Sequence, residues 1–121
     1  MTEINREELA WAAGFVDGEG YFWTRHRQTK KDRIKYATIG LNVHQVDKYA
    51  LERLNKALLG LGKVCGPYGP YSGNRQAHYQ YVVGNFADTE AVIALLWNWL
   101  GPVKRKQAAN ALKLATARLC K

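Results

Sequence analysis

The residue types best suited to chemistry in this chain are two carboxylates set among glycines, in the segment Asp17-Gly18-Glu19-Gly20. Gly18 and Gly20 predict the end of a helix, and the residue held between them is acidic. A carboxylate is a side chain that can bind a hard divalent cation. Taken alone, however, the four residues favour a simpler interpretation, the glycine-rich end of an ordinary amphipathic helix.

The helix that leads into this segment is predicted to begin near Arg6. Asn5 suits the N-cap with Glu8 three residues on, and Ile4 and Leu9 are spaced as a hydrophobic staple. One stripe of the helix has little side-chain bulk, and its members recur at i, i+3, i+4 and i+7: Ala10, Ala13, Gly14 and Asp17. This stripe predicts that another element approaches closely.

Length and composition predict one domain over residues 1–121. The 121 residues are 47% hydrophobic and 23% charged, which is ordinary for a globular protein. No apolar run approaches the length of a membrane span, and no secretory signal precedes the first helix. Cys65 and Cys120 lack metal-binding spacing, so we expect reduced thiols and no zinc site. We therefore expect a protein of the cytoplasm or an organellar matrix that is not secreted.

The net charge of +8 is concentrated in two segments. Residues 21–48 carry seven bases and two acids, and residues 101–121 carry six bases and no acid, whereas residues 1–20 carry one base and five acids. Localised positive charge favours a polyanionic partner, because phosphate contacts release counterions. The alternative is a basic surface that is merely solvated.

The remaining chain predicts four strands and three further helices. Strands are expected over 21–27, 33–45, 63–68 and 75–84, with a hairpin tip at 28–32 and a turn at 69–74. Helices are expected from an Asp47 cap to Leu59, from an Asp88 cap to Leu100, and from Val103 to Leu119. The order predicts an α+β fold, αββαββα(α), with helices on one face of an antiparallel sheet.

The other face of the sheet is predicted to be basic, aromatic and polar at once. Alternation puts Ile39, Leu41 and Val43 of the second strand toward the core, and Tyr81 and Val83 of the fourth. Side chains of the opposite phase, with the basic residues at the strand ends and the hairpin tip, are candidates for binding bases and phosphates. They are Tyr21, Trp23, Arg25, Arg27, Lys30, Lys31, Arg33, Tyr36, Thr38, Asn42, Arg75, Gln76, His78 and Gln80.

The segment 12–20, Ala-Ala-Gly-Phe-Val-Asp-Gly-Glu-Gly, resembles the signature helix of the LAGLIDADG homing endonucleases, with its residues lying on the nine motif positions in order. The order of elements along nearly the whole chain is also similar to that family, which implies a saddle-shaped sheet over the DNA major groove. Two positions depart from the motif. Ala12 stands where leucine is usual, and the acid is Glu19 rather than aspartate, as in many active relatives.

The resemblance implies roles for four residues. Glu19 matches the catalytic acid that coordinates a divalent metal, and the carbonyl of Gly18 is a further ligand. Gln45 matches a glutamine that orients active-site water, and Lys104 matches a lysine near the cleavage site. The implied cofactor is Mg²⁺, with Mn²⁺ as a substitute. Asp17 is expected to be structural, either facing the helix pair or capping a helix end.

One motif supplies one carboxylate set, whereas cutting both strands of a duplex needs two. The resemblance therefore implies a homodimer joined through Ala10, Ala13, Gly14 and Asp17, which cuts double-stranded DNA at a near-palindromic site and leaves 3′ overhangs. Such an intron-encoded homing endonuclease, or meganuclease, is our first hypothesis. The alternatives are a cleavage-inactive maturase or transcription regulator on the same fold, and an RNA-binding protein outside the family.

Overall fold

The computed structural model describes residues 4–28, 35–69 and 76–116, and within these segments it leaves out the side chains of residues 26–28 and 35–37. Four helices, a short 3-10 helix and four strands follow one another in the described segments. They are α1 (Arg6–Glu19), β1 (Gly20–Gln28), β2 (Lys35–Gln45), α2 (Lys48–Ala57), β3 (Lys63–Tyr68), β4 (His78–Val83), α3 (Phe86–Leu96), η1 (Trp97–Trp99) and α4 (Pro102–Thr116). This order confirms the predicted α+β fold.

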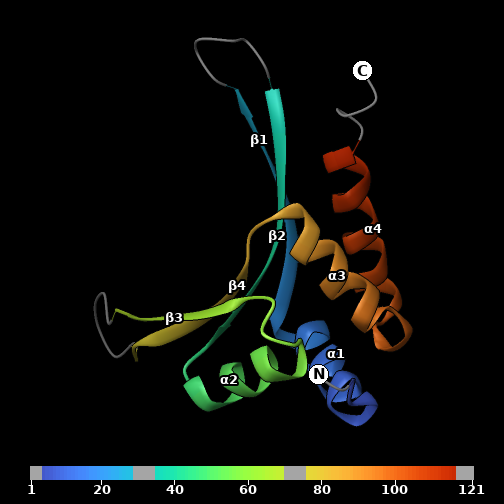
Figure 1. The fold of residues 1–121 in the computed structure, drawn as a ribbon. Helices are drawn as coiled ribbons and strands as arrows, with labels where there is room; N and C mark the ends of the chain where they lie inside the picture. The colour runs from blue at the N-terminus through green and yellow to red at the C-terminus, as the bar shows by residue number, and fades with distance from the viewer. Residues whose placement is uncertain (1–3, 29–34, 70–75, 117–121) are drawn as a thin grey trace.

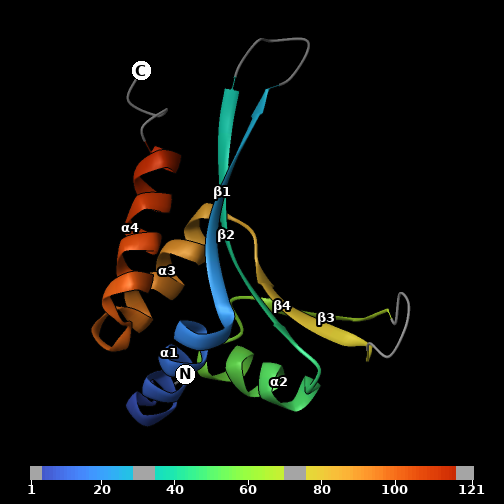
Figure 2. The same ribbon diagram turned by 180° about the vertical axis from the view of Figure 1, so that it is seen from behind.

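The strands form one antiparallel sheet in the order β1-β2-β4-β3. The sheet is strongly twisted, so that β1 and β2 stand upright in Figure 1 while β4 and β3 run across them. The helices gather on one side, with α4 beside β1 and β2 and with α2 beside β4 (Figures 1 and 2). None of the described helices covers the opposite face of the sheet.

The core lies between the sheet and the helices, as the alternation of apolar residues predicts. Ile39, Leu41 and Val43 of β2 have no exposed surface, and Tyr81 of β4 has none either. The helices add a second layer of buried side chains: Leu9, Ala12, Ala13, Val16, Leu51, Leu54, Val92, Ile93 and Leu96. None of the helices in the described segments is long and apolar enough to cross a membrane.

α1 begins where its sequence predicts and ends later than predicted. The Asn5 side chain accepts a hydrogen bond from the Glu8 N–H at 3.0 Å, which caps the helix at Arg6. The helix then continues through Gly18 to Glu19, and Gly20 is already extended as the first residue of β1. The helix end predicted at Gly18 and Gly20 is therefore a direct transition from α1 into β1, with no intervening turn. A Cβ at position 20 would lie 3.1 Å from Val43 and 3.2 Å from Val16, so glycine lets this passage pack closely.

The start of α3 also differs from the prediction. Asp88 was expected to cap this helix, but the N-cap is Asn85. The Asn85 side chain accepts from the Asp88 N–H at 2.8 Å and donates to the Asp88 carboxylate at 2.8 Å. The first bond satisfies one backbone N–H of the helix end, and the second joins the two side chains, with Asp88 three residues inside the cap. α3 ends at Leu96, and η1 covers part of the stretch predicted to continue to Leu100.

Candidate functional site

Three segments that carry the predicted catalytic residues converge at one end of the sheet. Glu19 is the exposed last residue of α1, and the pairing of Gly20 with Val43 brings it to the end of β2, where Gln45 is the last strand residue. Lys104 lies half-buried in the first turn of α4. No hydrogen bond or ion pair joins the three side chains within the described part of the chain.

Asp17 holds the third segment in place. Its carboxylate oxygens accept from the backbone N–H of Gly101, at 3.1 and 3.0 Å, just before α4 begins at Pro102. Asp17 is therefore bound within its own chain, where it ties the end of α1 to the start of α4. This agrees with the structural role expected of it.

Glu19 differs from Asp17 in having its carboxylate free. The side chain is exposed and makes no ion pair or hydrogen bond with any residue that the structure describes. The amide oxygen of Gln45 accepts from the Val46 N–H at 3.0 Å, which leaves its amide N–H groups for another partner. A free carboxylate, an amide donor and an ammonium group are thus held on neighbouring segments.

The small residues of α1 divide between two sides of the helix. Ala13 has no exposed surface and packs into the chain's own core. Gly14 and Gly18 are exposed, and a Cβ at either would meet nothing within 4 Å, while Ala10 is half-buried. We call Ala10, Gly14 and Gly18 the α1 stripe. It is the part of the small-residue face that a second molecule can reach.

A hydrogen-bonded row crosses the open face of the sheet. The Trp23 indole N–H donates to the Asn42 side-chain oxygen at 2.7 Å, and the Asn42 amide donates to the Gln80 side-chain oxygen at 3.3 Å. The guanidinium of Arg25 lies 4.9 Å from the centroid of the Trp23 ring. Thr38 donates to the Arg25 carbonyl at 3.4 Å. Five of the predicted face residues are therefore brought together.

A second row, made of rings, crosses all four strands of the same face. Tyr21 and His44 have centroids 6.1 Å apart, His44 and His78 stack at 5.6 Å with a 7° interplanar angle, and His78 and Tyr68 are 5.6 Å apart. Burial lowers the pKa of His44, and the neighbouring His78 lowers this pKa further. Protonation of His44 is therefore disfavoured on this surface.

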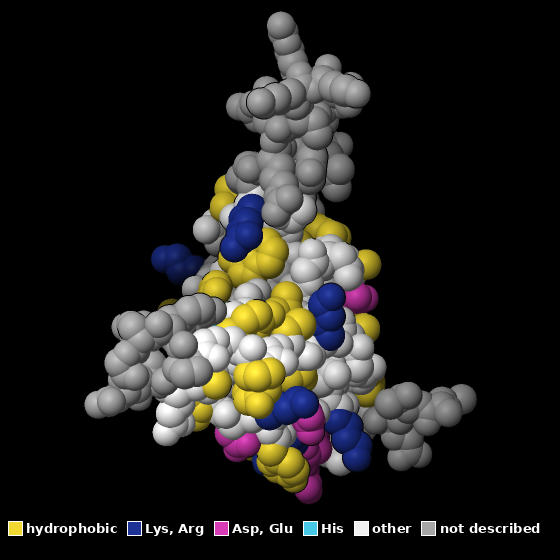
Figure 3. Space-filling model, turned by 90° about the vertical axis from the view of Figure 1, so that its left-hand side faces the viewer, with side chains coloured by type: hydrophobic (Ala, Val, Ile, Leu, Met, Phe, Trp, Pro, Cys, Tyr) yellow, Lys and Arg dark blue, Asp and Glu magenta, His cyan; other side chains and the backbone are white. Residues whose placement is uncertain are grey.

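The side of the molecule that looks left in Figure 1 combines apolar, polar and basic side chains. Figure 3 shows yellow apolar and aromatic groups among white polar ones, with blue basic groups beside them and acidic groups gathered toward the lower edge. Gln76 is exposed just before β4. The predicted residues Lys30, Lys31, Arg33 and Arg75 lie outside the described residues, as do the side chains of Arg27 and Tyr36.

Three residues that form the open face or hold β1 against α4 were not predicted from the sequence. His44 has the same strand phase as Asn42, so alternation puts it on the open face, yet it was not selected as a site residue. Tyr68 had no such signal, because its place depends on a β3–β4 register that is interrupted between Cys65 and Tyr68. Gln107 of α4 accepts from the Phe22 N–H of β1 at 2.8 Å, a contact between residues 85 apart in sequence.

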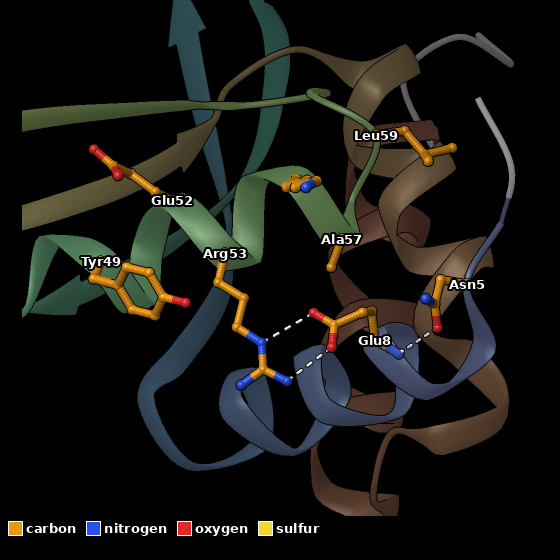
Figure 4. A pocket seen from close by; sticks show the side chains of 8 residues that line it. Asn5, Glu8, Tyr49, Glu52, Arg53, Ala57 and Leu59 are labelled. Carbon is orange, nitrogen blue, oxygen red and sulfur yellow. Dashed lines mark hydrogen bonds and ion pairs between the residues drawn. The ribbon is translucent and has the colours of Figure 1, made fainter. Parts of the chain in front are cut away.

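The side chains that line the hollow between α1 and α2 bind each other and stabilise the fold. Arg53 donates to both carboxylate oxygens of Glu8, at 2.9 and 2.8 Å (Figure 4), and its guanidinium lies 3.9 Å from the centroid of Trp11. The hydrogen bond from Arg53 holds the pKa of Glu8 below its ordinary value. Because these charges satisfy each other, they fasten α2 to α1 and are not free to act on a ligand.

The described segments contain no cluster of three or more His, Cys, Asp or Glu side chains that could hold a metal ion. Cys65 is a free, half-buried thiol, as expected.

Comparison with known proteins identifies the family. The family model described as LAGLIDADG endonuclease matches residues 12–109, from the α1 motif into α4. The fold is similar to the homing endonuclease I-CvuI in complex with its target, with a TM-score of 0.72, 21% identity and coverage of 94% of this chain and 69% of that one. It is also similar to the archaeal intron-encoded homing endonuclease I-Vdi141I complexed with DNA, with a TM-score of 0.73, 20% identity and coverage of 94% and 70%.

The group I intron-encoded homing endonuclease I-CeuI, complexed with DNA, matches with a TM-score of 0.68 and 17% identity over 95% of this chain and 56% of that one. A search of curated protein sequences finds no significant match. Since the family model spans most of the chain, including the motif helix, the sheet and the start of α4, the chain belongs to the LAGLIDADG endonuclease family.

Proposed function

We propose that the protein is a site-specific endonuclease that cuts double-stranded DNA as a homodimer on a near-palindromic site and leaves 3′ overhangs. The observation that carries this proposal is the free carboxylate of Glu19 at the convergence of α1, the end of β2 and the start of α4. A chain that only bound DNA would not need Glu19 together with Gln45 and Lys104.

The proposed dimer forms through the α1 stripe. Small side chains allow two helices to approach closely, and the half-buried Ala10 and the exposed Gly14 and Gly18 are four residues apart on one side of α1. Contact around a two-fold axis would bring the two Glu19 residues near the centre of the assembly. Each subunit would then supply one carboxylate for one DNA strand.

The residues fit a divalent cation that is bound by few protein groups. Glu19 and the carbonyl of Gly18 would hold Mg²⁺ or Mn²⁺, since one free carboxylate suits a cation that keeps several waters and phosphate oxygens. When bound, the cation neutralises phosphate charge and lowers the pKa of a coordinated water. In this proposal the Gln45 amide orients the water and the Lys104 ammonium neutralises phosphate charge.

Two properties of the open face support binding to the DNA major groove. No described helix covers the face, and the face is built from antiparallel strands, which the major groove can admit as two-stranded ribbons. Its side chains are hydrogen-bonding, aromatic and basic types, including Arg25, Asn42 and Gln80. These groups suit contacts with base edges and phosphates.

Selection of cleaved sites from a random duplex library in Mg²⁺ tests the proposal. We expect one near-palindromic motif, cut on both strands with 3′ overhangs. Bound sites that are never cut would instead support the cleavage-inactive alternative. Recovery of neither bound nor cut sites would overturn the proposed function.

The role of Glu19 is tested with Glu19→Gln on the recovered site. We expect cleavage to be lost while specific DNA binding stays within a few-fold of the wild type, because the amide keeps the size of the side chain and removes its charge. Glu7→Gln is the matched control, since Glu7 is an exposed carboxylate at the other end of the same helix. Wild-type cleavage by Glu19→Gln would refute the assignment.

A further inference from the structure

Two hydrogen bonds fasten α4 alongside β1. The side-chain oxygen of Gln107 accepts from the Phe22 N–H at 2.8 Å. One helical turn further along α4, the carbonyl of Ala111 accepts from the Thr24 hydroxyl at 3.1 Å. The partners follow one another in the same order on both elements, so α4 and β1 run in the same direction, side by side (Figures 1 and 2).

The spacing of the two bonds is nearly equal on the strand and on the helix. From Phe22 to Thr24 the strand rises about 6.6 Å, and from Gln107 to Ala111 the helix rises about 6 Å. Ala111 is buried, and its small side chain lets the helix lie close to the strand. α4 is therefore held in register with β1 over a full helical turn.

This register determines how far along β1 Lys104 lies. Lys104 precedes Gln107 by three residues, which is about 4.5 Å along the helix axis and about one to two residues on a strand. Counted back from Phe22, Lys104 is level with the first two residues of β1, which directly follow Glu19. Ala108, four residues after Lys104, is buried, so Lys104 begins the side of α4 that packs on the sheet.

Gln107 suits this contact because β1 is an edge strand. β1 pairs with β2 on one side only, so the backbone N–H groups on its other side need partners elsewhere. The Gln107 side chain provides such a partner for Phe22 from the neighbouring helix. The bond joins two residues that are each three positions beyond a proposed catalytic group, Lys104 on α4 and Glu19 at the end of α1.

A second contact holds the same two segments before the catalytic groups. The carboxylate of Asp17 accepts from the Gly101 N–H, ahead of Glu19 on one segment and ahead of Lys104 on the other. The Gln107 bond follows both groups. Movement of α4 along β1 is thus resisted on both sides of Lys104.

We infer that Gln107 is a positioning residue of the endonuclease, whose bond to Phe22 sets the register of α4 on β1 and so holds Lys104 level with the end of α1. This inference rests on the proposed function, since it requires that Glu19 and Lys104 act together on DNA. A displacement of about 1 Å in a catalytic group can slow a reaction roughly 100-fold. One hydrogen bond can therefore matter more for cleavage than for folding.

The experiment measures single-turnover cleavage of the selected site in Mg²⁺ and affinity for that site in Ca²⁺. Gln107→Met keeps the length of the side chain and removes the acceptor. It should cut roughly 10- to 100-fold more slowly than the wild type, with affinity within about twofold. Gln107→Asn keeps the amide but is one methylene shorter, and it should also be slowed. The result then does not depend on how well methionine fits.

Thr24→Val is the matched control. It removes the other bond between β1 and α4, one helical turn further from Lys104, and it preserves the shape of the side chain. It should bind and cut at close to the wild-type rate. Slowing by Thr24→Val equal to that by Gln107→Met would show that cleavage depends on the docking of α4 in general, and would overturn the role of Gln107.

A double-mutant cycle shows whether Gln107 acts through Lys104. Lys104→Met alone should slow cleavage by roughly 100- to 1,000-fold, because a charge that stabilises the transition state is lost. In that background Gln107→Met should slow cleavage less than about twofold further, since the group that Gln107 positions is already absent. A contact that only stabilised the fold would slow cleavage by the same factor in both backgrounds.

The outcomes separate this inference from the proposed function. If the wild type cuts its site and Gln107→Met cuts equally fast, or if the two substitutions multiply in full, only this inference is overturned. If Lys104→Met cuts at the wild-type rate, the role of Lys104 is wrong and the inference fails with it, whereas Glu19→Gln still tests the nuclease. If the wild type cuts no selected site, the proposed function itself fails.

Discussion

At the scale of single residues, two carboxylates separated by one glycine have different roles because their partners differ. Asp17 accepts from the Gly101 N–H, whereas the Glu19 side chain makes no hydrogen bond or ion pair with any other residue of the described chain. Sequence spacing alone does not reveal this division, because Gly101 is 84 residues away from Asp17. Because Asp17 is bound in this way, it fixes the backbone that carries Glu19. The carboxylate of Glu19 itself remains free.

Tyr81 gives a prediction about stability at this scale. Its ring is fully buried, and its hydroxyl has no hydrogen-bond partner among the described residues. An unsatisfied buried hydroxyl opposes folding, so Tyr81→Phe should raise the free energy of unfolding by about 1 kcal/mol in urea denaturation. Tyr79→Phe, at a half-buried position of the same strand, should change it little. A loss of stability in Tyr81→Phe would show that the hydroxyl has a partner.

His44 gives a prediction about pH. Burial and His78 lower its pKa from the ordinary 6.5, so the folded state binds a proton less readily than the unfolded state. The stability linked to this group is complete above about pH 6.5 and decreases as pH falls through the folded pKa. An NMR titration should give a pKa below 6.5 for His44, and His78→Ala should move it part of the way back. A value at or above 6.5 in the wild type would contradict this explanation.

At the scale of elements, the sequence predicts what depends on local periodicity and capping. The Asn5 cap, the Asp47 cap and the alternation in β2 agree with the structure. The prediction was wrong for the α3 cap, where Asn85 and Asp88 both suit a cap and only their reciprocal hydrogen bonds decide between them. Contacts between distant segments, such as Gln107 with Phe22, have no local pattern at all.

The contact between α1 and α4 can be tested through Asp17. Asp17→Ala removes a charge-assisted hydrogen bond and should lower the free energy of unfolding by about 2 kcal/mol. Because the same contact positions the first turn of α4, it should also slow cleavage by displacing Lys104. Asp17→Asn keeps one oxygen acceptor and should recover part of both losses. Unchanged stability in Asp17→Ala would mean that the contact does not hold α4.

At the scale of the whole molecule, the proposed active site is incomplete in one chain and depends on association. The family match and the α1 stripe point to the same helix, but the small-residue pattern alone overestimated the available surface. Ala13 belongs to the chain's own core, and Asp17 is occupied by Gly101. The surface left for a second copy is therefore formed by Ala10, Gly14 and Gly18. This surface is narrower than the interface predicted from the sequence, so a substitution within it gives a sharper test of the proposed dimer.

Gly14→Leu should separate dimer formation from folding. In the single chain a side chain at position 14 meets open space, and leucine favours the helix by up to about 1 kcal/mol over glycine, so the fold should remain intact. In the dimer the same side chain would overfill a close helix contact. Light scattering should show a dimer for the wild type and a monomer for Gly14→Leu, with unchanged circular dichroism and lost double-strand cleavage. Ala94→Leu, which adds a comparable side chain to an exposed site on α3, should remain a dimer. A monomeric wild type, even with DNA, would overturn the two-fold arrangement.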